Sequence, residues 1–254
     1  MKRFFKNGWQ PVAAIFLFIV FWEISVQLSS LEEWFLPAPT VIVLELFDVW
    51  PTFYPQLIST LTIAAIGFVI GTTVGLLVGI TLHLFPRVKE TFYPFLILSQ
   101  NIPIIVLAPL LVIWFGFGTL PKFIIITLAC FFPITISTLS GLQQTSRELT
   151  YYMKMMGARK SQMFWKLELP YAVPSIISGL KISATYSVMA AVVSEWLGAQ
   201  KGIGVFMTIA TSSYKTSRVF VAIVITMLLS LAFFSLILLL ERILTRWQKR
   251  GETR

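Results

Sequence analysis

The stretch LISTLTIAAIGFVIGTTVGLLVGITL, residues 57–82, contains no charged side chain. A helix needs about 20 predominantly apolar residues to cross the hydrocarbon core of a bilayer. The stretch therefore predicts a transmembrane helix. Its glycines, Gly67, Gly71, Gly75 and Gly79, recur at every fourth position and lie on one helix face. Such a face lets another helix approach closely, so we interpret it as a packing surface, with a partner in this chain or in another.

The composition of the whole chain agrees with a membrane protein. Of 254 residues, 57% are apolar and 12% are charged, with a mean hydropathy of +0.83, whereas about a quarter of a soluble domain is charged. This excludes a secreted or cytosolic enzyme, a disordered chain and a coiled coil. The apolar runs are continuous rather than alternating, which argues against a transmembrane barrel.

Six stretches are long and apolar enough to span a bilayer, so we expect an all-α, polytopic protein of about six transmembrane helices. No linker or repeat is evident, so we expect residues 1–254 to form a single membrane domain. The predicted spans are Val12–Ser29, Leu57–Leu82, Pro94–Phe115, Pro121–Gly141, Ala172–Leu197 and Val219–Leu240.

Basic residues predict the orientation of these spans. The net charge is +9, and most Lys and Arg residues lie in the N-terminus, the second loop, residues 142–171 and the C-terminal tail. Cytoplasmic loops carry such an excess, so both termini and residues 142–171 are expected in the cytoplasm. The loop 30–56 has no Lys or Arg and is expected outside, with a short amphipathic helix capped by Thr40. The charges thus indicate topology, and no nucleic-acid partner is expected.

Polar residues within the spans are candidates for a solute pathway, because buried polar groups are costly in lipid. Gln100 and Asn101 precede Pro103 in the third span, where an unwound helix would line a cavity or the proline would merely kink it. Glu195 ends the fifth span. Glu23 is expected to be paired or near the outer interface, and Lys181 to extend toward the cytoplasmic face.

Other residues argue against chemistry in this chain. His83 is the only histidine and Cys130 the only cysteine, which excludes a histidine-rich metal site and an intrachain disulfide. We interpret His83 as a solvated loop residue. There is no phosphate-binding Gly-x-x-x-x-Gly-Lys-Ser/Thr motif. No enzyme activity, metal or cofactor is therefore expected, and any ATP would be used by another polypeptide.

Residues Arg147–Pro170, which we call the hairpin, read as two helices joined at Gly157 and ended by Pro170. Glycine permits the positive φ of a sharp turn, and proline interrupts a helix. The hairpin is richer in methionine and aromatic residues than a solvated loop requires. We therefore expect it to dock on a cytoplasmic protein.

The hairpin resembles the cytoplasmic loop of permeases from binding-protein-dependent ABC importers, in which Glu-Ala-Ala precedes a glycine and Leu-Pro follows. Gly157 and Leu169-Pro170 match, whereas Tyr151, Tyr152 and Met153 replace the triplet. Further motifs, including residues 36–39, 114–118 and 194–199, resemble the nitrate, sulfonate, taurine and thiamine-pyrimidine-precursor branch.

The resemblance implies a type I importer permease in a bacterial plasma membrane. It further implies a second permease copy, which we expect to be identical so that the permease is a homodimer. The other implied partners are two cytoplasmic ATPase subunits that bind ATP and Mg, and an extracytoplasmic binding protein. The solute would be small and organic or oxyanionic. The residues that would couple the chain to the ATPase are Glu148, Tyr151, Tyr152, Met153, Gly157, Ala158, Phe164, Leu167, Leu169 and Pro170.

Three other readings compete with the importer. An ion-coupled secondary transporter would use Glu23, Lys181 and Glu195 as intramembrane charges, but it would not need the hairpin. An intramembrane enzyme lacks paired catalytic residues at span depth. The third alternative is a subunit that serves only in the assembly of a complex and forms no solute pathway.

Overall fold

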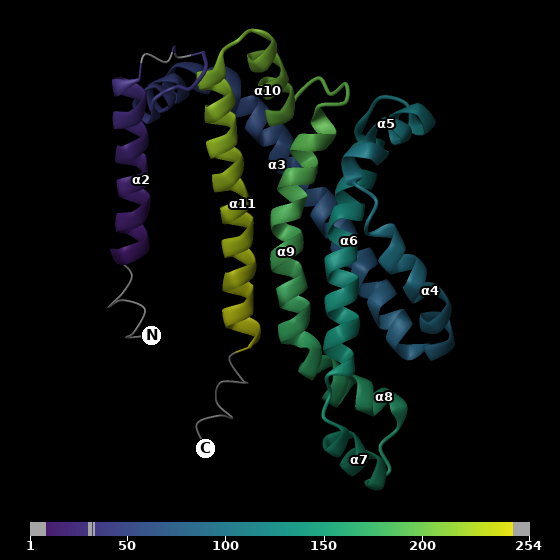
Figure 1. The fold of residues 1–254 in the computed structure, drawn as a ribbon. Helices are drawn as coiled ribbons and strands as arrows, with labels where there is room; N and C mark the ends of the chain where they lie inside the picture. Colours follow the sequence, from purple (N-terminus) through teal and green to yellow (C-terminus); the bar gives the residue numbers. More distant parts are fainter. Residues whose placement is uncertain (1–8, 30–31, 33, 246–254) are drawn as a thin grey trace.

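The computed structural model describes residues 9–29, 32 and 34–245, and these residues form helices without a strand (Figure 1). The charged residues of both chain ends lie largely outside the described residues. The helices are α2 (Trp9–Leu28), α3 (Pro39–Leu84), α4 (Pro86–Ser99), α5 (Ile104–Phe115), α6 (Thr119–Gln143), α7 (Arg147–Met155), α8 (Lys160–Met163), the π-helix η1 (Phe164–Glu168), α9 (Leu169–Glu195), α10 (Ile203–Ser212) and α11 (Thr216–Leu244).

The prediction of about six spans is confirmed. Among the described residues, five helices are long and apolar enough to cross a membrane, and the bent pair α4–α5 is a sixth when it is counted as one broken span. In Figure 1, the N-terminal end of α2 and the C-terminal end of α11 point toward the same end of the bundle as α7 and α8. This is the arrangement that the charge pattern predicts, although the side of the membrane remains a prediction from the charges.

The prediction of a separate outer helix before the second span is wrong. The helix α3 runs without interruption from Pro39 through Pro51 and Pro55 to Leu84, so it absorbs much of the expected loop 30–56. Each internal proline removes one backbone donor, a loss that a long helix with other packing contacts tolerates. Thr40 does not cap this helix, because its N-cap is Ala38.

The expected stop at Pro170 is also wrong. Residues Lys160–Glu195 form one continuous helical stretch that includes η1. The Leu169 N–H donates to the carbonyl of Phe164, five residues earlier. This wide turn changes the hydrogen-bond register directly before Pro170, where a donor is missing, and the helix therefore continues.

The core lies where α6 is held between α3 and α9. A Cβ added at Gly75 would lie 3.0 Å from the carbonyl oxygen of Phe131. A Cβ at Gly67, Gly71 or Gly79 would lie 2.5, 2.7 or 2.8 Å, respectively, from a side-chain atom of α6. The partner of the glycine face is therefore in the same chain. On the other side of α6, a Cβ at Gly179 would lie 2.9 Å from the carbonyl oxygen of Pro133. Small residues thus bring the three helix backbones together.

Candidate functional site

The third predicted span is broken at the polar residues that the sequence indicates. The helices α4 and α5 are bent by 98° at the segment between Ser99 and Ile104. Asn101 and Ile102 donate from their backbone N–H groups to Leu98 and Ser99 in a turn, and Pro103 is extended, with φ −61° and ψ 121°. Proline disfavours the helical conformation in the residue before it, which explains why the helix stops here.

A cavity of about 640 Å³ lies at this break. Among the residues that the structure describes, its polar lining comes from Gln100, Asn101 and Tyr186, and no Lys, Arg, Asp or Glu lines it. Gln100 and Asn101 are exposed, and the Asn101 side chain donates to the carbonyl of Ile97 at 2.7 Å. The other lining residues are Ile102, Pro103, Ile104, Ile105, Ala129, Met189, Ala190 and Val193. The two amides therefore face a space that a small solute can occupy.

The third pathway candidate, Glu195, lies outside this cavity lining. It is 1% exposed and accepts hydrogen bonds from the Thr60 hydroxyl and the Gly204 N–H, both at 2.8 Å. The Ile203 N–H donates to Thr60 and the Gly202 N–H to the side chain of Gln56. Three successive N–H groups at the start of α10 are thus bonded by side chains, which satisfies donors that a helix terminus leaves free.

The glycines at the start of α10 lie so close to Glu195 that a side chain at either position would collide with it. A Cβ at Gly202, where φ is +133°, would lie 2.0 Å from the carboxyl carbon of Glu195. A Cβ at Gly204 would lie 2.3 Å from the carbonyl oxygen of Val192. Sequence reasoning missed α10, Gln56 and Thr60 as partners of Glu195. The Gly-Ile-Gly pattern was the available signal.

The hairpin turn occurs at Gly157, as predicted, with φ +76°. The Ala158 N–H donates to Met153 and the Gly157 N–H to Lys154, which is the Schellman pattern that ends α7. Ser146 caps the start of α7 through the Leu149 N–H. Local sequence therefore determines both ends of this helix.

The hairpin exposes one set of apolar side chains and buries another. Tyr151, Tyr152, Met155, Met156 and Trp165 are each more than 60% exposed. A hollow of about 370 Å³ lies on α7, lined by Arg147, Glu148, Tyr151, Tyr152 and Met155. The hairpin thus offers an apolar surface with few contacts within this chain.

The second arm of the hairpin is anchored in the bundle. Phe164 is buried with Leu142 and Ala172, and Leu169 packs against this cluster. Of the other predicted coupling residues, Met153, Ala158, Leu167 and Pro170 are half-buried and Glu148 is exposed. The predicted coupling set is therefore divided between an exposed surface and an anchor.

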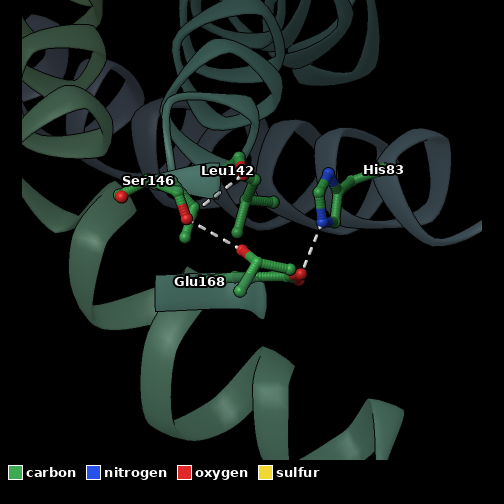
Figure 2. A network of polar contacts seen from close by, with 6 residues as sticks. His83, Leu142, Ser146 and Glu168 are labelled. Carbon is green, nitrogen blue, oxygen red and sulfur yellow. Dashed lines mark hydrogen bonds and ion pairs between the residues drawn. The ribbon is translucent and has the colours of Figure 1, made fainter. Parts of the chain in front are cut away.

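His83 is not a solvated loop residue, and that interpretation is corrected here. It lies in the last turn of α3, and its Nε2 is 2.9 Å from Oε2 of Glu168 (Figure 2). The two residues are 85 positions apart in the chain. Sequence spacing gave no signal of this pair, because helix packing alone brings them together.

The remaining intramembrane charges have partners. Lys181 of α9 pairs with Glu241 of α11 at 2.7 Å instead of extending freely. Glu23 accepts hydrogen bonds from the backbone and hydroxyl of Thr40, at 3.1 and 2.8 Å. The charges that an ion-coupled transporter would use are therefore engaged in structural contacts.

Comparison with known proteins gives a consistent result. Residues 71–246 match the family described as "Binding-protein-dependent transport system inner membrane component". The chain is 36% identical over 251 residues to the formylaminopyrimidine transport permease protein ThiX of Halalkalibacterium halodurans, covering 98% of this chain and 100% of that protein. It is 28% identical over 238 residues to the taurine transport system permease protein TauC of Escherichia coli, covering 91% and 86%.

The fold has a solved counterpart. The structure titled "Crystal structure of an amino acid ABC transporter with histidines" superimposes with a TM-score of 0.66 at 16% identity, covering 78% of this chain and 97% of that chain. The helical bundle, the matched family and the relatives agree with one another. The chain therefore belongs to the inner-membrane permease family of binding-protein-dependent ABC importers, and it is a multi-pass membrane subunit of such a transporter.

Proposed function

We propose that this chain forms one half of a solute pathway, together with a second, identical copy. An extracytoplasmic binding protein delivers the solute to the face that carries α10. Two cytoplasmic ATPase subunits each receive one hairpin and supply the energy, since the sequence has no phosphate-binding loop of its own.

The exposed apolar surface of the hairpin carries this proposal. Tyr151, Tyr152 and Met155 are exposed on α7, between the candidate spans Thr119–Gln143 and Lys160–Glu195. Exposed apolar patches of this kind mark protein interaction sites. The second arm of the hairpin, anchored at Phe164, would transmit a movement of the docked surface to α6 and α9, which carry Leu142 and Ala172.

The cavity at the break between α4 and α5 supports a pathway and a class of solute. The described part of its lining offers amides and a phenol but no cation. A sulfonate would lose water there without gaining a charged partner, which is costly. A neutral heterocycle with hydrogen-bonding groups would be satisfied by Gln100, Asn101 and Tyr186. We therefore favour a pyrimidine-type solute over a sulfonate.

Copurification tests the assembly. A C-terminally tagged chain, extracted gently from its native membrane, should bring down an ATPase with phosphate-loop motifs and a second copy that carries a different tag. Gly157→Val should lose the ATPase, whereas Gly157→Asn should keep it, because asparagine tolerates a positive φ. A preparation without ATPase, from a membrane in which other ABC complexes survive, would contradict the proposal.

Uptake tests the solute class. Cells or proteoliposomes that contain the complete transporter should accumulate formylaminopyrimidine in an ATP-dependent manner, and an excess of taurine should not compete. Uptake that persists without ATP and collapses with a protonophore would instead favour an ion-coupled transporter. Competition by taurine alone would reverse the assignment between the two solute classes.

A further inference from the structure

We propose that the side-chain hydrogen bond between His83 and Glu168 is a positioning contact that transmits movement of the hairpin to α3 and α4. This inference rests on the proposed docking of the hairpin on an ATPase. It adds a second route, since the covalent connection from the hairpin leads only into α6 and α9.

The pair is placed at the junction of three elements. Glu168 is the last residue of η1, where the hairpin joins α9, and His83 is in the last turn of α3. Their side chains are 17% (His83) and 18% (Glu168) exposed, so water competes only weakly for the contact. Figure 2 shows the imidazole of His83 directed at the Glu168 carboxylate. A partly buried, charge-assisted contact holds its geometry better than a surface pair.

An apolar layer reinforces the contact. Ile80, one turn before His83, packs against the cluster of Leu142, Phe164 and Ala172. The anchor of the hairpin therefore touches α3 twice, through Ile80 and through His83. The π-helix that presents Glu168 is of a type found frequently at functional sites.

The end of α3 leads directly to the pathway. Three residues after His83, α4 begins at Pro86 and runs to Ser99, beside the break at Gln100. Its 14 residues act as a helical arm of about 21 Å at 1.5 Å per residue. A displacement of Glu168 would thus reach the cavity lining through His83 and α4, a path that bypasses the packed core.

The test uses the whole transporter, with its ATPase and its cognate binding protein as purified, in lipid nanodiscs. The measured quantity is the ratio of ATP turnover with and without binding protein. His83→Ala and Glu168→Ala should each lower this ratio by about fivefold, the lower end of typical coupling between sites. The double variant should be no worse than either single variant, because both remove one contact.

Two controls separate coupling from stability. Lys181→Ala and Glu241→Ala break another partly buried side-chain contact, between α9 and α11, and they should leave the ratio unchanged. The exchanged pair, His83→Glu with Glu168→His, should restore much of the ratio.

The outcomes are distinct. If the ATP-turnover ratio is unchanged in both His83→Ala and Glu168→Ala, this proposal is overturned and the proposed function is not. The same holds if the Lys181 and Glu241 variants lower the ratio as much as these two do. A loss accompanied by an equal loss of bound ATPase or of thermal stability assigns the pair to folding and also overturns it. Absence of any ATPase bound to the unaltered chain would overturn the proposed function itself.

Discussion

The helix α6 and the pair α4–α5 both contain proline in apolar sequence, but only one of them breaks. The helix α6 stays continuous from Thr119 to Gln143 through Pro133. In contrast, the axes of α4 and α5 differ in direction by 98°, and the segment that joins these two helices contains Pro103. Pro133 lies where Gly179 brings the backbone of α9 against α6. Residues 100–103 are exposed and carry two amides. Proline therefore allows a break, and packing decides whether it occurs.

This contrast separates a rigid part of the molecule from an adaptable one. The contacts among α3, α6 and α9 leave no room for added side chains, so a movement there must be shared by all three helices. The break at Gln100 faces a cavity and can change shape at lower cost. We expect substitutions in the first region to affect stability and substitutions in the second to affect transport.

The largest expected effect follows from filling the glycine face. Gly75→Leu should destabilise the protein by about 3 kcal/mol, the upper part of the usual range for overpacking, because the added atoms meet the Phe131 carbonyl. Thermal unfolding of the purified protein measures this. Val74→Leu on the same helix is the matched control and should change little. A Gly75→Leu protein as stable as the control would contradict close packing of α3 on α6.

Removing the carboxylate at the start of α10 should have the next largest effect. Glu195→Ala leaves the Gly204 N–H and the Thr60 hydroxyl without this partner, at a cost of about 1–3 kcal/mol. Glu195→Gln should cost less, since its amide oxygen can still accept from Gly204. Hydrogen exchange of the α10 amides is the measurement. Equal protection in the alanine variant and the unaltered chain would show that Glu195 does not hold α10.

The hairpin turn should respond locally. Gly157→Val places a β-branched side chain at φ +76°, which costs about 1–3 kcal/mol of backbone strain. Apart from Gly157 and its chain neighbours, no atom of the described residues lies within 4 Å of the added Cβ, so strain alone should disturb the turn. Limited proteolysis should reveal faster cleavage in the hairpin, with unchanged protection of α6. Equal cleavage of the valine and asparagine variants would contradict this expectation.

The smallest effect on stability is expected at the break. Gln100→Ala and Asn101→Ala should change the unfolding free energy by no more than about 0.5 kcal/mol, as exposed substitutions usually do. They should nevertheless raise the KM for uptake, because they remove hydrogen-bonding groups from the cavity. Leu98→Ala, on the exposed face of α4, is the control. A stability loss without a change in KM would identify the amides as structural.

Local signals in the sequence predicted much of this architecture. Apolar runs located the spans, the Gln-Asn-Ile-Pro segment located the break, and Gly157 located the turn of the hairpin. These features depend on residues close together in the chain. The continuity of α3 through Pro51 and Pro55, and of α9 through Pro170, was not predictable in this way. In both cases the helix persists despite a missing donor.

The sequence by itself determined the class of protein, the number of spans and the turn at Gly157, because hydropathy and backbone conformation are properties of short segments. Only the tertiary structure decided that Gly75 and the other glycines of its helix face pack on α6 of the same chain. It also placed Glu195 at the start of α10 and joined His83 to Glu168. These contacts link residues far apart in the chain, and their geometry is determined by how close the small residues allow the helices to approach.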